Sequence, residues 1–203
     1  MQSRPSAAHR RSAPEALIAL GANLPSTQGD PAETLEAALA LIAARGIEVI
    51  GRSAWYASPA WPAGSGPDYV NGAARLSALL SPHDLMQALH RVETMLGRRR
   101  EGTERWQARP CDIDLIAHGS AVIPGLEAWR RVAAAAPETP RPGLCLPHPL
   151  MHERAFVLVP LAEIAPAWRH PVRGETVGTM LAALPEKERK AVRRLAGDAG
   201  DTT

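Results

Sequence analysis

Two predicted helices with the same start and stop signals constrain the fold of this chain more than any other feature. Residues 30–46 open with Asp-Pro-Ala-Glu, residues 81–97 open with Ser-Pro-His-Asp, and each segment ends at a glycine. An N-cap residue followed by proline, an acid in the first turn and a final glycine are typical of a complete helix. Apolar residues recur at helical spacing in both segments, so each helix is expected to bury one face. The expected buried residues are Leu35, Leu39 and Ile42 in the first helix and Leu85, Leu89, Val92 and Leu96 in the second.

Strand-like runs lie on both sides of these helices. Residues 16–20 are apolar, residues 47–55 are rich in β-branched and aromatic side chains, and residues 69–80 read as the next strand. A further strand is expected within residues 104–118. The order is therefore strand, helix, strand, strand, helix, loop, strand, which is the split βαβ order. We predict an α+β fold, a ferredoxin-like α/β sandwich with a mainly antiparallel sheet and helices packed on it.

Beyond residue 118 the pattern is weaker. Residues 119–146 contain an Ala-rich helix candidate followed by a turn-rich tether, residues 154–164 read as a short apolar helix or strand, and residues 174–184 read as a helix. His148 lies between two prolines, and such a fixed backbone suits a side chain that must be aimed, although a single histidine in a loop is also ordinary.

The length of 203 residues favours one domain. We expect a flexible N-terminal tail over residues 1–15, the domain over residues 16–185 and a charged C-terminal tail over residues 186–203. The first 14 residues are rich in Arg, Ser and Ala and contain no acid, so they superficially resemble a transit peptide. A frayed tail is the interpretation we favour, because the same composition runs through the whole chain.

Two carboxylates, Asp112 and Asp114, stand two residues apart in a run that otherwise reads as a strand. Side chains alternate between the faces of a strand, so both acids are expected on one face, roughly 6 to 7 Å apart. Paired carboxylates beside arginines suit Mg²⁺-dependent phosphoryl transfer, since oxygen ligands hold the metal and guanidinium groups bind phosphate. A solvated Asp pair at the end of an edge strand is the other interpretation of this triplet alone.

Charge and motif content exclude several classes of protein. The net charge is only +2, which does not suggest wholesale binding of nucleic acid, but residues 91–109 carry six Arg against three Glu and form a candidate anion site. No GxxxxGK[ST] loop and no GxGxxG run occur, so phosphates would have to be held by arginine and metal. The two cysteines form no CxxC pair, and no apolar run approaches the roughly 18 residues of a membrane span. We expect a cytoplasmic protein that binds neither nucleic acid nor membranes.

Three residues are candidates for holding a planar ligand. Tyr69 and Asn71 are expected on one face of their strand, where they would offer hydrogen bonds to a heterocycle. Trp61 lies in a loop dense in proline, which would present its ring to a ligand, although a surface loop with one tucked tryptophan fits the same residues.

Taken in order, several short motifs resemble the hydroxymethyl-dihydropterin pyrophosphokinases of folate biosynthesis. The motifs are LGANL, SPAW, DYVNGA, ETMLGRRREGTERW, RPCDIDL and LPHPLMHERAFVLVPLAEIAP, and the resemblance runs from about Ala16 to Leu184. It implies that the β,γ-pyrophosphoryl group of Mg²⁺-ATP passes to the hydroxymethyl oxygen of 6-hydroxymethyl-7,8-dihydropterin, with release of AMP. It also implies two Mg²⁺ ions, ATP as co-substrate and no obligate protein partner, and we expect a monomer.

The resemblance implies a role for each matching residue. Asp112 and Asp114 would hold the magnesium ions, and Arg98 and Arg109 would stabilise the charge that moves at the β-phosphorus, so these four are the catalytic candidates. Glu93 would support the site. The candidates for binding ATP are Arg98, Arg100, Arg109, His148 and Arg154. The candidates for binding the pterin are Ser58, Pro59, Trp61, Tyr69, Asn71, Trp106 and Phe156.

The chain departs from the family pattern in four places. They are Gln107-Ala108, Pro110 in place of a usual small polar residue, an arginine loop one residue longer, which leaves the choice of Arg100 over Arg99 open, and residues 119–146. Gln107-Ala108 stands where Gly-Pro is usual, so the backbone that leads to Arg109 can differ from that of the family. The same change leaves open a second interpretation, in which the chain is a degenerate pyrophosphokinase that acts only as an assembly partner. Residues 119–146 are longer than expected and are interpreted as an insertion that is an ornament, a lid or a dimer contact. The alternative from another class is a non-catalytic nucleotide- or RNA-binding module on the same sandwich.

Overall fold

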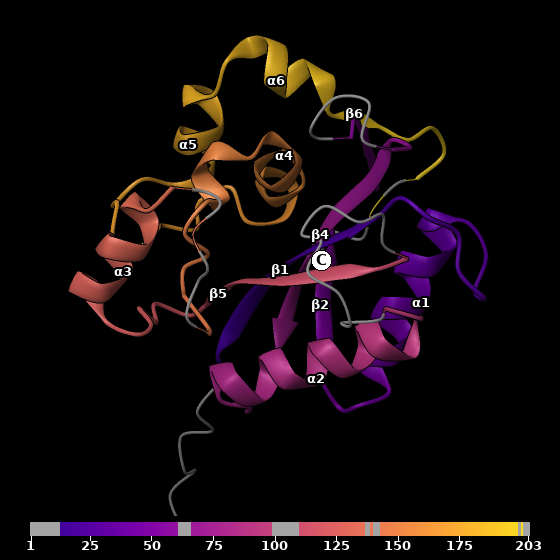
Figure 1. The fold of residues 1–203 in the computed structure, drawn as a ribbon, viewed down its shortest axis with the longest axis horizontal. Helices are drawn as coiled ribbons and strands as arrows, with labels where there is room; N and C mark the ends of the chain where they lie inside the picture. The colour runs from indigo at the N-terminus through magenta and orange to yellow at the C-terminus, as the bar shows by residue number, and fades with distance from the viewer. Residues whose placement is uncertain are drawn as a thin grey trace, which may run out of the picture.

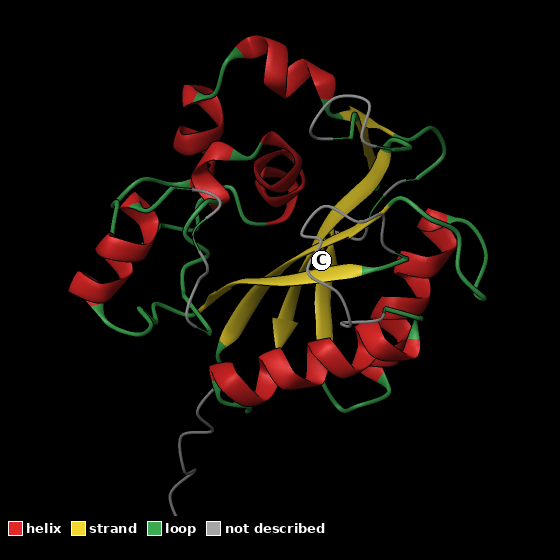
Figure 2. Cartoon of the chain, in the orientation of Figure 1, coloured by secondary structure: helices red, strands yellow, loops and turns green. Residues whose placement is uncertain are grey.

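The computed structural model describes residues 13–60, 66–98, 110–136, 139, 143–198 and 200. The described chain forms one sheet with helices on both sides of it (Figures 1 and 2). The strands are β1 (Glu15–Ala22), β2 (Glu48–Arg52), β3 (Tyr56–Ser58), β4 (Tyr69–Ser77), β5 (Asp112–His118) and β6 (Arg193–Arg194). The helices are α1 (Pro31–Ala43), α2 (Pro82–Met95), α3 (Leu126–Ala134), α4 (Ala155–Ile164), α5 (Val177–Ala183) and α6 (Glu186–Ala191), with a 3₁₀ turn at Met151–Glu153.

The strand order across the sheet is β5, β1, β4, β3 and β6, and β2 also pairs with β4. Every strand pair in the described part of the chain is antiparallel. Strand β4 is the central strand of the sheet. On one side it pairs with β1 through residues 70–77, and on the other side it pairs with both β2 and β3. The prediction of an α+β fold with a mainly antiparallel sheet is confirmed.

Helices α1 and α2 cover one face of the sheet (Figure 1). Asp30 caps α1 as predicted: its Oδ1 accepts from the backbone N–H of Glu33 at 2.9 Å, and the Glu33 carboxylate accepts from the N–H of Asp30 at 2.9 Å. Gly97, with φ of 90°, follows α2 in the left-handed conformation that favours glycine. All seven predicted apolar residues are buried: Leu35, Leu39, Ile42, Leu85, Leu89, Val92 and Leu96.

Helices α4 and α5 cover the opposite face (Figure 1). Residues 154–164, ambiguous in sequence, are helical because α4 is apolar all round and lies between the sheet and α5. Helix α3 belongs to the segment predicted as an insertion and carries one buried side chain, Trp129, whose Nε1 donates to the Pro147 carbonyl at 2.6 Å. None of the helices in the described residues combines the length and the apolar character needed to cross a bilayer.

Two features of the sheet differ from the sequence prediction. Residues 47–55 were expected to form one strand, but the structure has a corner at residues 53–55 that separates β2 from β3. Strand β6 falls within the predicted tail and pairs with β3 through Arg193 and Arg194. Two exposed arginines carry no hydrophobic alternation, so periodicity has nothing to detect there.

Candidate functional site

Arg98 stands between two acids at the centre of the site. It follows α2, and its Nη1 donates both to Oε1 of Glu93 in the last turn of α2 and to Oδ1 of Asp112 at the start of β5. Glu93 is fully buried, and its Oε1 also accepts from the backbone N–H of Ile113 at 2.8 Å. The end of α2 and the start of β5 are therefore joined through one carboxylate and one guanidinium group.

The acids around Arg98 keep it charged. Burial by itself would lower its pKa, but Asp112 and Glu93, and more weakly Asp114, outweigh burial, so the pKa of Arg98 is raised above its ordinary value. A permanently charged guanidinium group that is only 16% exposed can bind oxyanions strongly, since little water competes for it.

Asp112 and Asp114 share a face of the sheet, as the alternation predicted. Asp112 lies opposite Gly21 of β1, which lies opposite Asn71 of β4, so a row of three residues crosses the sheet. Asp114 lies in the next row, opposite Ala19, which packs in the core beneath α4 and α5. Both acids are half-buried and point to the side of the sheet where α4 begins.

Gly21 is a residue of this face that sequence reasoning did not single out. A Cβ at this position would lie 3.5 Å from Oδ1 of Asn71 and 4.0 Å from Cδ1 of Tyr69. Its lack of a side chain leaves open space on the sheet between Asp112 and Asn71. The available signal was a glycine inside a strand pattern, within LGANL, which often marks close approach of another group.

Three of the pterin candidates lie together at one end of β3 and β4. Asn71, 4% exposed, donates from Nδ2 to Oγ of Ser58 at 2.9 Å and to the Tyr69 carbonyl at 3.4 Å. Ser58 lies opposite Tyr69 in the sheet, and Pro59, just after β3, is exposed. Ser58, Tyr69 and Asn71 share the face of Asp112 and Asp114, while their role as pterin ligands stays a prediction.

The remaining described candidates lie between β5 and the start of α4. The backbone N–H of His148 donates to the carbonyl of Ile116 at 2.8 Å, which attaches the loop to β5 two residues beyond Asp114. Arg154 is the N-cap residue of α4, and its guanidinium carbon lies 5.7 Å from the ring centroid of Phe156. Phe156 is the exposed aromatic of this helix, at 36%.

Four predicted site residues lie outside the described residues: Trp61, Arg100, Trp106 and Arg109. Residues 107–108, where the chain departs from the family pattern, also lie outside the described residues. The expected effect of Gln107-Ala108 on Arg109 therefore stays a prediction.

Cys111 directly precedes the carboxylate pair but has no reactive character. It is fully buried, and burial, followed by the nearby charges of Glu93 and Asp112, raises the pKa of its thiol to about 12. A thiol in this state is neutral at physiological pH and acts as a small apolar residue.

The fold and this site define the class: an α+β protein with a carboxylate pair and a largely buried arginine, a set suited to phosphate chemistry. Residues 17–166 match the family model described as 7,8-dihydro-6-hydroxymethylpterin-pyrophosphokinase (HPPK). The chain belongs to this family.

Curated relatives agree with the family match. A 2-amino-4-hydroxy-6-hydroxymethyldihydropteridine pyrophosphokinase of Synechocystis is 40% identical over 163 residues, covering 80% of this chain and 72% of the relative. The protein with the same name from Methylorubrum extorquens is 38% identical over 170 residues, covering 83% of this chain and 92% of the relative. Family membership does not favour the alternative of a non-catalytic nucleotide- or RNA-binding module.

Solved structures show the same fold. A crystal structure of Plasmodium falciparum HPPK-DHPS A437G with pteroate superposes with a TM-score of 0.60 at 13% identity and covers 86% of this chain. The S436F/A437G/A613S variant with pterin and p-hydrobenzoate gives a TM-score of 0.60 at 12% identity and covers 92% of this chain. This chain spans 44% and 48% of those two chains, so at such low identity they support the fold alone.

Proposed function

We propose that this protein transfers the β,γ-pyrophosphoryl group of ATP to the hydroxymethyl oxygen of 6-hydroxymethyl-7,8-dihydropterin, as a step of folate biosynthesis. The hydroxymethyl oxygen forms a bond to the β-phosphorus and loses its proton to solvent, the bond from that phosphorus to the oxygen bridging to the α-phosphorus breaks, and AMP leaves. Membership of the pyrophosphokinase family supports this reaction. The observation that carries it to particular residues is Arg98, held between Glu93 and Asp112 on the face that also carries Asn71.

The carboxylate pair fits magnesium. Asp112 and Asp114 offer hard oxygen ligands from neighbouring rows of one sheet face. No group of three or more His, Cys, Asp or Glu residues in the described ranges is arranged to enclose a metal. Mg²⁺ commonly takes one or two protein carboxylates and completes its shell with phosphate oxygens and water. We therefore assign two ions to Asp112 and Asp114, which would hold them, and the ions would neutralise negative charge that develops on the phosphates during transfer.

The protein's own work in this reaction is positioning and electrostatic stabilisation. Arg98 is only 16% exposed, charged and fixed by Glu93, so its guanidinium group needs little reorganisation to face a phosphate. We assign Arg109 the same role at the β-phosphorus. Arg100, His148 and Arg154 are assigned to ATP.

On the pterin side, the Ser58–Asn71 hydrogen bond orients the amide that would meet the polar edge of the ring. Exposed Phe156 would stack on one ring face, as would Trp106 on the other. Pro59, Trp61 and Tyr69 are assigned to the same pocket.

The test is AMP formation from ATP, measured with and without Mg²⁺ and the hydroxymethyl-dihydropterin, in wild type, Asp112→Asn and Asp114→Asn. Each variant keeps the shape of the side chain and removes its charge. We expect AMP that requires both metal and pterin, and a fall in kcat of about 10³ or more in each variant, since metal and arginine provide most of the stabilisation.

Asp84→Asn is the matched control, because Asp84 is an exposed acid in the first turn of α2, at the opposite end of that helix from Glu93. Its rate should equal that of wild type. Pterin-independent AMP, or no AMP at all from folded wild-type protein, would refute the proposed reaction. Wild-type rates in both site variants would refute the assignment of the carboxylates.

A further inference from the structure

The corner between β2 and β3 determines where the pterin side of the site lies. Ser53 is fully buried at this corner: its N–H donates to the Ala73 carbonyl and its Oγ accepts from the Ala73 N–H, both at 2.9 Å. The ring of Trp55 lies directly over Gly72, where a Cβ would come within 2.3 Å of the ring. Ser58, which bonds Asn71, follows Trp55 by three residues. A shift of the corner would therefore move Ser58.

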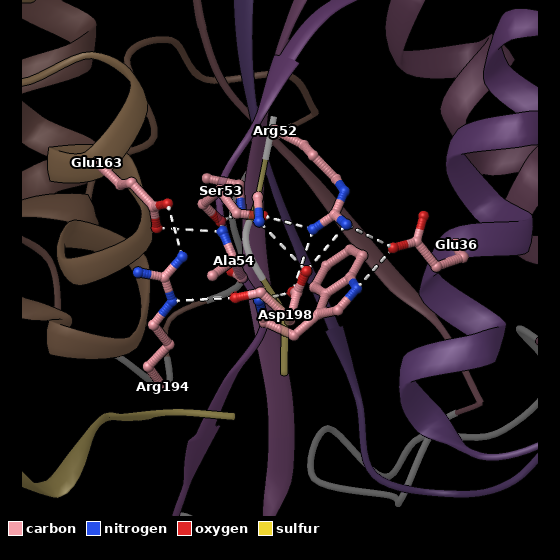
Figure 3. A network of polar contacts seen from close by, with 10 residues as sticks. Glu36, Arg52, Ser53, Ala54, Glu163, Arg194 and Asp198 are labelled. Atoms are coloured by element: carbon pink, nitrogen blue, oxygen red, sulfur yellow. Dashed lines mark hydrogen bonds and ion pairs between the residues drawn. The ribbon is translucent and has the colours of Figure 1, made fainter. Parts of the chain in front are cut away.

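Asp198, near the end of the described chain, is bound to this corner (Figure 3). Its Oδ2 accepts from the backbone N–H of Trp55 at 2.5 Å and from Nη1 of Arg52 at 3.1 Å, and its Oδ1 accepts from Nη2 of Arg52 at 2.9 Å. Fork-shaped contacts of this kind fix direction as well as distance. The Asp198 side chain is only 15% exposed and that of Arg52 17%, so solvent weakens this pair less than an ordinary surface ion pair.

The segment from Arg193 to Asp198 also completes the edge of the sheet beside the corner. Strand β6 pairs with Tyr56 and Ala57 of β3, and the N–H of Leu195 donates to the Trp55 carbonyl at 2.9 Å. Both backbone polar groups of Trp55 are thus bonded to this one segment. Without it, β3 would be a three-residue edge strand with an open side.

Glu163 connects the same corner to α4 (Figure 3). Its Oε2 accepts from the backbone N–H of Ala54 at 3.1 Å and from the hydroxyl of Tyr56 at 2.8 Å, and its Oε1 lies 3.6 Å from Nη2 of Arg194. Helix α4 begins beside Arg154, a candidate ATP ligand. The corner is therefore held from both sides, by the C-terminal segment and by the helix that borders the site.

We propose that residues 193–198 act as a latch that positions the pterin-binding end of β3 and β4, with Asp198 as its positioning residue. The inference rests on the proposed function and assigns a further determinant of pterin affinity. The two core clusters contain no fully buried residue from the latch, and only Leu195 packs against one of them. Releasing the latch should therefore loosen the corner without unfolding the domain.

Two substitutions test the latch, one that removes a hydrogen-bond acceptor and one that introduces a steric clash. Asp198→Ala removes the acceptor for Trp55 and Arg52. Gly200→Ala leaves every charge in place, but its Cβ would lie 2.7 Å from the Ala54 nitrogen and would push the end of the chain away from the corner. The matched control is Glu175→Gln, which removes a carboxylate that accepts from Nε of Arg173 at 2.6 Å, on a segment outside the latch.

The readouts are the KM values for the pterin and for ATP, kcat, and amide hydrogen exchange of the peptide covering residues 54–58. We expect both latch variants to raise the pterin KM about tenfold and to leave the ATP KM and kcat within about twofold, because binding of one substrate is weakened and the chemistry is untouched. Exchange at residues 54–58 should become faster in both. Glu175→Gln should match wild type in every readout.

Four outcomes would overturn the latch. They are an unchanged pterin KM in both variants, an equal rise of both KM values, unchanged exchange at residues 54–58, and loss of cooperative unfolding, which would make the segment part of the fold itself. Lack of pterin-dependent AMP formation in wild type would refute the proposed function instead, and with it the link between latch and pterin.

Discussion

His170 should make this protein lose stability in mild acid. The side chain is fully buried, and its ring meets those of Trp129 and Trp168 edge-on, with centroids 5.3 and 5.9 Å apart. Its Nδ1 accepts from the backbone N–H groups of Val172 and Arg173, both at 3.2 Å, so this nitrogen carries no proton. Nε2 has no hydrogen-bond partner within the described chain. A proton added to this imidazole would therefore break two hydrogen bonds and place a charge between aromatic rings.

The size of the expected loss of stability follows from the pKa of His170. Burial, followed by the positive charge of Arg173 and by His152, lowers the pKa of His170 from 6.5 to about 4, although Glu175 acts in the opposite direction. Between these values the unfolded chain binds a proton that the folded chain does not bind, so the free energy of unfolding falls as the pH falls through this window. A fall in the pKa of His170 from 6.5 to about 4 corresponds to about 3 kcal/mol. The pKa of His152 is also lowered, mainly by burial, and contributes with the same sign.

Asp198 does not contribute to the loss of stability in this pH window. Burial would raise the pKa of Asp198, but hydrogen bonds from Arg52 and from the Trp55 and Gly200 backbone outweigh it and lower the pKa below the ordinary value of 3.8. The stability that this acid contributes is present above that ordinary value and is lost as the pH falls through the still lower folded value. Asp198 therefore adds little pH dependence of stability above about pH 4.

The measurement is urea unfolding, followed by tryptophan fluorescence at several pH values between about 7 and 4.5, for wild type and His170→Asn. Asparagine keeps an acceptor for the Val172 and Arg173 N–H groups but does not titrate. We expect wild type to lose about 2 kcal/mol more than the variant between these two pH values. Equal pH dependence in both proteins, within about 0.5 kcal/mol, would show that His170 is protonated in the fold and would refute the reasoning.

Three further predictions concern packing elsewhere in the domain. Gly72→Ala should cost about 1 to 3 kcal/mol in urea unfolding, because its Cβ would lie 2.3 Å from the Trp55 ring; an unchanged free energy of unfolding would show that the ring has room to move. Trp129→Phe should cost about 1 to 3 kcal/mol, since it leaves the Pro147 carbonyl without its donor at 2.6 Å, and a neutral result would mean that water replaces the indole. Cys111, buried and with its pKa raised to about 12, should react with a thiol reagent at about pH 8 only after urea unfolding; fast labelling of the native protein would contradict its burial.

Local chemistry explains why so much of the fold was predictable. The capping residues Asp30 and Glu33 lie within one turn of helix. The sequence of this turn was enough to predict the cap, which the structure forms with two reciprocal hydrogen bonds of 2.9 Å. Strand alternation placed Asp112 and Asp114 on one face for the same reason, because it depends only on the period of the backbone. Both signals act over a few residues and need no knowledge of the rest of the chain.

Long-range pairing explains what sequence reasoning missed. Asp198 bonds the N–H of Trp55 across 143 residues of chain, and Glu163 bonds that of Ala54 across 109. Glu163 stands in the motif of residues 146–166 but was given no role there, and the charged composition of the last 18 residues, which include Asp198, favoured a solvated tail. Only the assembled sheet shows that the corner at residues 53–55 has backbone N–H groups that need these two carboxylates.

The unequal burial of the two acids around Arg98 suggests how the site can change partners. The Glu93 side chain is 1% exposed, whereas that of Asp112 is 32% exposed, although both accept from the same nitrogen. Removing the contact to Glu93 would leave a buried charge uncompensated, while the contact to Asp112 is partly open to solvent and is less costly to exchange. Glu93 therefore anchors the guanidinium group, whereas a ligand that binds Arg98 or Asp112 more strongly can replace the contact between Arg98 and Asp112. A cation bound at Asp112 and a phosphate bound at Arg98 would each replace what the other loses, so metal and nucleotide should bind this site together more tightly than either binds alone.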